Sequence, residues 1–212
     1  MNQLLDLLSN KISLPQEYHN FADKRIFLGI PNMMNIISNI AILIPALYLL
    51  QRKKKTKESN LLILHIILLS VASSYYHFNP SDETIFGDLL MIAASSMIIL
   101  IIISDTEYGL LLYSYAIFSI LYWKYTGDLR FYILILIGVP LYIVIKYYKD
   151  INLRNYVYII IIATILLRLS EHNDHFIYKL TNKQISGHTL KHIFSGIGIG
   201  SIVLLLQKVN RI

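Results

Sequence analysis

Long apolar runs without a charged residue are the feature that most restricts how this chain can fold. Residues 28–51 contain no Asp, Glu, Lys or Arg, and similar runs recur along the sequence. Charged residues make up 15% of the 212 positions, against about 25% in soluble domains. A helix crosses the hydrocarbon core of a bilayer with about 20 apolar residues, so these runs predict an all-α, multi-pass integral membrane protein.

Seven windows have the length and polarity of a membrane-spanning helix. They cover residues 27–51, 60–77, 85–104, 108–125, 131–147, 155–170 and 188–207. The sixth is the weakest, because Arg168 interrupts it. Loops are short and no internal repeat is visible, so residues 27–212 are expected to form one bundle of seven transmembrane helices. Residues 1–26 precede it as a tail, in which residues 1–12 could form a short interfacial helix.

The basic residues predict an orientation. Lys and Arg sit at the ends of the apolar windows rather than in a stripe with interleaved aromatics, which argues against a nucleic-acid partner. They are more numerous after the first, fifth and seventh windows than on the other face, and the positive-inside rule places that richer face in the cytosol. We therefore expect a cytosolic C-terminus, and an N-terminus on the outer or lumenal side of the membrane. The basic residues of the expected cytosolic face are Arg52, Lys53, Lys54, Lys55, Lys57, Lys146, Lys149, Arg154, Lys208 and Arg211.

Polar groups inside the windows suggest a site. Ser73 and His77 are four residues apart at the end of the second window, as are His188 and His192 at the start of the seventh, so each pair shares one helix face. Asp88 lies too far into the third window to cap it. The end of the second window and the starts of the third and seventh lie on the same side of the membrane. The five side chains can therefore meet at one depth, where ionisable groups are costly and are candidates for function.

Three His and one Asp on three helices predict a metal centre. The chain has no cysteine, so a metal can be held only by His, Asp or Glu. Three His ligands leave one position open, which is typical of catalytic zinc. Asp88 could then take a proton from the attacking water, and Ser73 could donate to the developing oxyanion. Taken singly, each residue also has a structural explanation, such as an interfacial hydrogen bond or helix packing.

The same residues resemble a known motif. Ser-x3-His-x10-Asp, here Ser73, His77 and Asp88, followed by His188-x3-His192 in a seven-span chain, is similar to the alkaline ceramidase superfamily of membrane hydrolases, which includes the progestin/adipoQ receptors. Residues 21–25, 29–32 and 186–192 look most like a ceramidase-like branch known mainly from bacteria. The resemblance implies zinc held by the three histidines, with Asp88 activating water and Ser73 assisting at the carbonyl.

One part of the family pattern is missing. Eukaryotic ceramidases carry a calcium site built from an N-terminal acidic run and a Glu at the start of the first span. This sequence has no such run, and Asn32 stands where the Glu would fall. Calcium is therefore not expected, although Glu17 and Asp23 could be a remnant, and ceramide itself becomes a less secure substrate.

Other polar residues are expected to support the site or the fold. Asn32, Asn35, Ser38 and Asn39 repeat at helical spacing and should face the bundle interior, where they either join helices or orient the histidines. Glu171, His172, Asp174 and His175 are expected in a solvated loop rather than as metal ligands, although Glu171 could support the ligand histidines.

The expected function is zinc-dependent cleavage of an amide bond in a membrane lipid, with the bilayer as the only obligatory partner and the active site on the outer or lumenal side. Three alternatives stay open: a receptor or adaptor that keeps the metal as structure, a hydrolase of ester lipids, and a transporter with the His and Asp residues as an ion relay.

Overall fold

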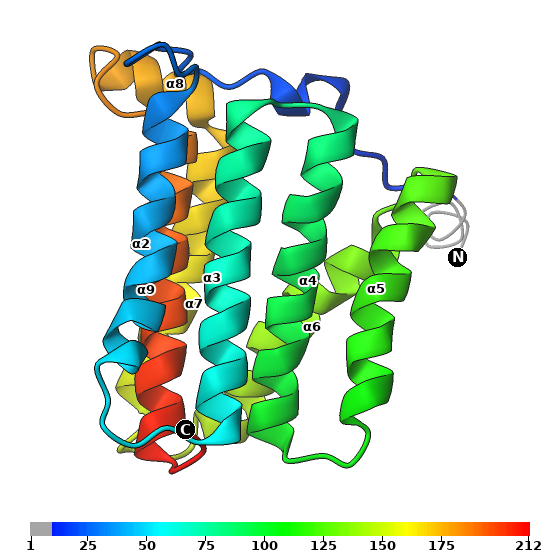
Figure 1. The fold of residues 1–212 in the computed structure, drawn as a ribbon, viewed down its shortest axis with the longest axis vertical. Coiled ribbons are helices and arrows are strands. Elements are labelled where there is room, and N and C mark those ends of the chain that lie inside the picture. The colour runs from blue at the N-terminus through cyan, green and yellow to red at the C-terminus, as the bar shows by residue number, and fades with distance from the viewer. Residues whose placement is uncertain (1–9) are drawn as a thin grey trace.

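The computed structural model describes residues 10–212, and this part of the chain is helical, with no β-strand. Residues 1–9, which hold most of the expected interfacial helix, lie outside the described range. A short 3-10 helix, η1, is followed by eight α-helices (Figure 1). Their bounds are η1 Gln16–His19, α2 Met33–Leu50, α3 Lys57–Phe78, α4 Asp82–Ser104, α5 Gly109–Thr126, α6 Arg130–Tyr147, α7 Arg154–His172, α8 Asp174–Leu180 and α9 Gly187–Lys208.

Each predicted window coincides with a long helix, but the first window starts too early. Helix α2 begins at Met33 rather than Phe27, because the preceding chain turns back on itself. Phe27 and Ile30 bridge each other, and Leu28, Gly29 and Asn32 have positive φ angles that a helix does not allow.

Five helices, α2, α3, α4, α6 and α9, are long and apolar enough to cross a membrane, consistent with a multi-pass membrane protein. Helices α5 and α7 are not among them, so seven spans are not confirmed. Polar residues explain the difference. Helix α5 carries Lys124 and several tyrosines, and α7 contains Arg168 and Glu171 near one end.

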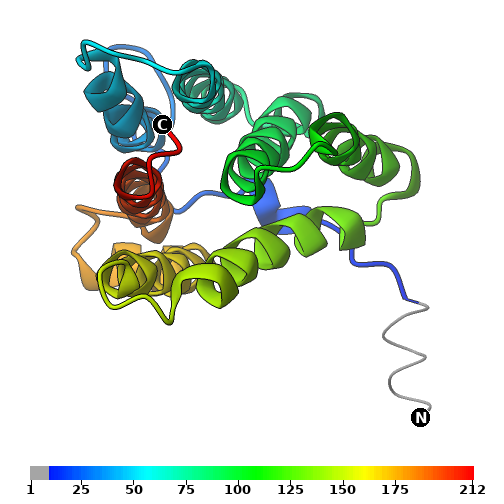
Figure 2. The same ribbon diagram turned by 90° about the horizontal axis from the view of Figure 1, so that it is seen from below.

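Helix packing closes a ring. Going around it, α2 contacts α3, α3 contacts α4, α4 contacts α6, α6 contacts α7, α7 contacts α9, and α9 returns to α2. Helix α5 packs outside this ring against α4 and α6 (Figure 2). The most extensive contact joins α9 to α7, and α9 also packs extensively against α2. The helix that carries two of the candidate histidines is therefore held on both flanks.

Large apolar side chains also cover the outside of the bundle. Ile40 and Ile44 on α2, Leu110 on α5 and Ile137 on α6 are all more than half exposed. A water-soluble protein rarely exposes apolar surface on this scale, whereas lipid solvates such side chains well. Several polar side chains of the helices, such as Asn39, Ser70 and Ser95, are by contrast buried between helices.

Capping side chains set the starts of α4 and α9. Ser81 accepts a hydrogen bond from the backbone N–H of Thr84 and forms a capping box with it. Ser186 accepts from the backbone N–H of Thr189 in the same way. Each cap satisfies a backbone donor that would otherwise lack a partner.

Gly196 allows a close contact between α9 and α2 in the core. A Cβ atom at Gly196 would lie 2.2 Å from the carbonyl oxygen of Ala41 on α2, whereas one at Gly198 would lie 3.6 Å from the Ala163 side chain. We expect Gly196→Ala to destabilise the protein by about 1–3 kcal/mol through overpacking, and Gly198→Ala to be close to neutral. Thermal unfolding in detergent measures both. Equal melting temperatures for the two variants would contradict the close approach.

Candidate metal centre

Three histidines converge at one end of the bundle, near the top in Figure 1. His77 comes from the last turn of α3, and His188 and His192 come from the first two turns of α9. The Nε2 atom of His77 lies 3.2 Å from Nε2 of His192 and 3.3 Å from Nε2 of His188. All three side chains are buried, and one nitrogen of each lies within 4.8 Å of the others, so the three could hold one metal ion.

The hydrogen bonds of His192 determine where its proton sits. Its Nδ1 atom lies 3.1 Å from the carbonyl oxygen of Asn35 and 2.7 Å from the Ser38 hydroxyl. A carbonyl oxygen can only accept, so Nδ1 carries the hydrogen and Nε2 presents a lone pair to the other two rings. A lone pair aimed at a cluster of imidazole nitrogens is the donor arrangement that a metal cation satisfies. The donor set of this site therefore fits a metal.

Helix α2 supplies groups that orient the histidines. The Ser38 hydroxyl, besides contacting His192, donates to the carbonyl of Asn35. Asn32 donates from its amide to the backbone carbonyl of His77. The expectation that these residues face inward is correct, and both of the roles considered for them occur together. Such outer contacts fix the ring orientation of metal-binding histidines.

Asn35 also joins α2 to the start of α9. Its side-chain carbonyl lies 3.2 Å from the Thr189 hydroxyl and 3.4 Å from the Ser186 hydroxyl, and both hydroxyls can donate to it. Asn35 is fully buried, and its amide nitrogen has no partner among the described residues. Asn39, one turn deeper, likewise has a side-chain oxygen without a partner.

Asp88 on α4 is buried beside the turn of α3 that carries Ser73. The Ser73 side chain is a hydrogen-bonding neighbour of its carboxyl group, and Ser73 lies one turn before His77. Oxygen Oδ1 of Asp88 has no hydrogen-bond partner in the described chain. A buried carboxyl oxygen without a partner is costly, and it is free to accept a proton or a hydrogen bond.

Residues before α2 cover the histidines. The Phe21 ring is buried, with its centroid 4.8 Å from the ring of His77 and 4.6 Å from that of His188. Asp174 holds this segment down, because its carboxylate accepts hydrogen bonds from the backbone N–H groups of Ala22 and His188. One carboxylate thus fixes the covering segment and the start of α9 together.

Glu171 and Asp174 correct one expectation. Both were expected in a solvated loop, but Asp174 is buried, and Glu171 lies near the C-terminal end of α7 with only 18% of its side chain exposed. Glu171 pairs with Lys191 at 2.5 Å and with Arg168 at 3.0 Å, and it accepts a hydrogen bond from Tyr18. His172 and His175 are exposed, but they lie in α7 and α8 rather than in a loop.

Phe21, Lys191 and Tyr18 were missed as site residues. The sequence could have indicated Lys191, because it is the one charged residue between the two candidate ligands His188 and His192, and Glu171 offers the opposite charge at a similar depth. No feature of the sequence indicated Phe21 or Tyr18, since nothing in a polar tail shows which aromatic ring folds back onto the bundle.

No family model and no curated protein matches this chain. The resemblance to the alkaline ceramidase superfamily therefore rests on the motif residues and their spacing.

Ser38 offers a test of ring orientation. We expect Ser38→Ala to weaken metal binding by about 10–100-fold, because loss of a partner of a ligand histidine has effects of that size. Competition against a chelator of known affinity measures it. Ser195→Ala is the control, since Ser195 lies on α9 three residues from His192 but donates only to the carbonyl of Lys191. Unchanged affinity in Ser38→Ala would contradict the assigned role.

Asp23 makes the covering segment sensitive to acid. Burial alone would raise the pKa of its carboxyl group, but the hydrogen bonds and charge of Arg25 outweigh burial and hold that pKa below its ordinary value. A carboxyl group whose pKa is lower in the folded than in the unfolded state stabilises the fold. This stabilisation is complete above the unfolded-state pKa of about 3.9 and is lost as the pH falls through the folded-state pKa. We expect the melting temperature of the wild type to be higher than that of Asp23→Asn at pH 6, and this difference to shrink below about pH 4. A difference independent of pH would contradict this.

Proposed function

We propose that this protein is a zinc-dependent intramembrane hydrolase that cleaves an amide bond in a ceramide-like lipid. The observation that carries the proposal is the convergence of the three Nε2 atoms of His77, His188 and His192. The buried carboxyl group of Asp88 lies next to Ser73, one turn before His77 on α3. Zinc bonds to histidine nitrogen at about 2.0–2.1 Å, so two nitrogens in tetrahedral positions are about 3.3–3.4 Å apart. The separations of 3.2 and 3.3 Å agree with that spacing.

His77, His188 and His192 would hold the zinc ion, which would supply a Lewis acid and make water nucleophilic near neutral pH. The chain's own groups then have distinct roles. Asp88 accepts the proton of the attacking water at its free oxygen and passes it to the leaving nitrogen. Ser73 donates a hydrogen bond to the carbonyl oxygen as negative charge develops there. The apolar surroundings exclude bulk water, which strengthens these interactions.

The membrane setting follows from the packing. We propose that α5 and α7 cross the bilayer with the five more apolar helices, because α7 lies in the ring and α5 packs along it. Lys124 lies in the last turn of α5 and Arg168 just before the last turn of α7, from where long basic side chains can reach the interface. The excess of basic residues at the opposite end supports an outer or lumenal site and a cytosolic C-terminus.

The decisive experiment combines metal content with turnover. Full-length protein purified in a mild detergent should contain about one zinc per chain by elemental analysis, and His77→Ala and His188→Ala should each lose it. Asp88→Asn should keep the zinc but lower the hydrolysis of an N-acyl sphingoid lipid by about 10²–10⁴-fold, the usual contribution of a general base. Released fatty acid is measured by mass spectrometry.

His65→Ala is the matched control, because His65 is also a buried histidine on α3 but bonds to the Leu61 carbonyl and the Tyr113 hydroxyl, away from the triad. Wild type that binds no zinc would overturn the metal centre. Zinc without turnover of amide or ester lipids would instead favour a receptor or adaptor. Turnover of ester lipids alone would correct the bond cleaved while keeping the mechanism.

A further inference from the structure

Charge is distributed very unevenly between the two ends of the bundle. At the triad end, nine Lys and Arg residues face eight described carboxylates, so the charges nearly balance. At the opposite end, ten Lys and Arg residues face only four carboxylates, namely Glu58, Asp105, Glu107 and Asp150. This excess of six equals the formal net charge of the whole chain. We call the second end the basic end.

The loop between α2 and α3 concentrates this excess. It reads Gln-Arg-Lys-Lys-Lys-Thr-Lys from position 51 to 57, and these side chains are exposed. Within residues 10–212, no carboxylate pairs with any cation of this loop, whereas Arg211 on the same end pairs with Asp105. The one hydrogen bond from a lysine of the loop runs from Nζ of Lys55 to the carbonyl of Arg52.

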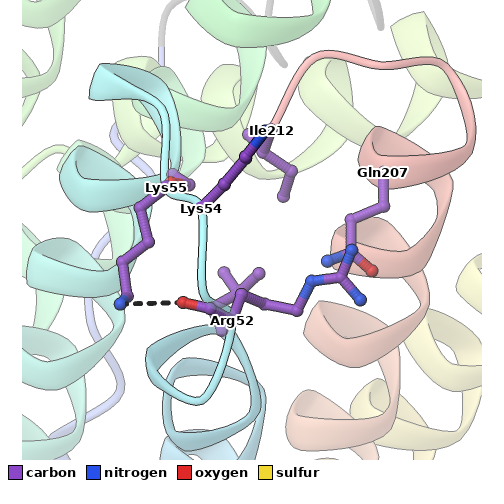
Figure 3. A pocket seen from close by; sticks show the side chains of 7 residues that line it. Arg52, Lys54, Lys55, Gln207 and Ile212 are labelled. Carbon is purple, nitrogen blue, oxygen red and sulfur yellow. Dashed lines mark hydrogen bonds between the residues drawn. The ribbon is translucent and has the colours of Figure 1, made fainter.

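Three of these cations surround a small hollow. Arg52, Lys54 and Lys55 border it together with Gln207 and Ile212 at the end of α9 (Figure 3), and Leu49 and Ser59 complete the lining. Its volume of about 40 Å³ corresponds to roughly three water molecules, which is also about the size of a phosphate group. The loop ends at the start of α3, whose dipole adds positive potential.

Unpaired cations held around a common hollow repel one another, and an anion relieves that repulsion. Phosphate oxygens are the usual partners of Arg and Lys, Arg binding through its fork and Lys as a point charge. The hollow lies where three apolar helices end, so the nearest source of phosphate is the headgroup layer of the bilayer. Basic clusters next to a membrane span attract anionic lipids in this way.

We propose that the hollow bordered by Arg52, Lys54 and Lys55 binds the phosphate of an anionic phospholipid in the leaflet at the basic end. The acyl chains of that lipid lie along the exposed apolar faces of α2 and α3. This site is independent of the triad and of the hydrolase proposal, because it lies at the other end of the bundle and uses none of the same residues.

The test measures lipid binding by the full-length protein, purified in a nonionic detergent with its affinity tag at the N-terminus. Phosphatidylglycerol, phosphatidylcholine with the same acyl chains, and inorganic phosphate are each added, and thermal unfolding and native mass spectrometry report binding. We expect phosphatidylglycerol to raise the melting temperature and to remain bound, and the other two to do neither. In the Arg52→Gln/Lys54→Gln/Lys55→Gln variant the apparent affinity for phosphatidylglycerol should fall on the order of 100-fold, about fivefold for each cation.

The matched control removes the same charge elsewhere, in Lys24→Gln/Lys179→Gln/Lys183→Gln, whose side chains are exposed at the triad end. It should bind phosphatidylglycerol as wild type does. Lys54→Gln alone, expected to lose about fivefold, keeps the test valid if the triple variant folds poorly. Equal losses in the two triple variants, equal binding of phosphatidylcholine, or equal protection by inorganic phosphate would each overturn the proposal.

Discussion

The need to satisfy buried polar groups where no water is available shapes this molecule. Its helices are apolar on the outside, so each polar side chain within them must find a hydrogen-bond partner inside the protein or carry an energetic penalty. The largest group of such residues is the three imidazoles of His77, His188 and His192. Helix α2 meets this need with Ser38, Asn35 and Asn32, which contact the histidines or the backbone next to them. Because α9 packs tightly against α2 and α7, these contacts hold two ligand residues in a rigid frame.

The same constraint explains the charged groups around the triad. Glu171 and Lys191 would each be costly alone at this depth, but as a pair, with Arg168 and Tyr18 attached, they join α7, α9 and the segment before α2. Asp174 uses one carboxylate to hold both Ala22 and His188. The two ends of the bundle therefore differ in kind. At the triad end, four of the nine basic residues form ion pairs with carboxylates, whereas no cation of the α2–α3 loop pairs with a carboxylate of residues 10–212.

Much of this could be read from the sequence, and the errors have physical causes. All seven long helices coincide with predicted windows, because apolar length is a local property. The first helix begins later than predicted because residues 27–32 turn at positive φ angles, which hydropathy does not report. Glu171 and Asp174 were assigned to solvent because they follow an apolar run in a polar stretch. Their actual partners, Lys191 and the N–H groups of Ala22 and His188, come from other segments of the chain.

The sequence alone determined the helical class, the positions of the helices and the spacing that puts His188 and His192 on one face of α9. These features depend on residues within a few turns of each other. Only the tertiary structure decided that His77 meets that pair, that Ser38 orients His192, that Phe21 covers the rings and that Arg52, Lys54 and Lys55 surround one hollow. The physical reason is that these contacts join segments brought together by the order in which helices pack around the ring, and a local pattern of polarity does not encode that order.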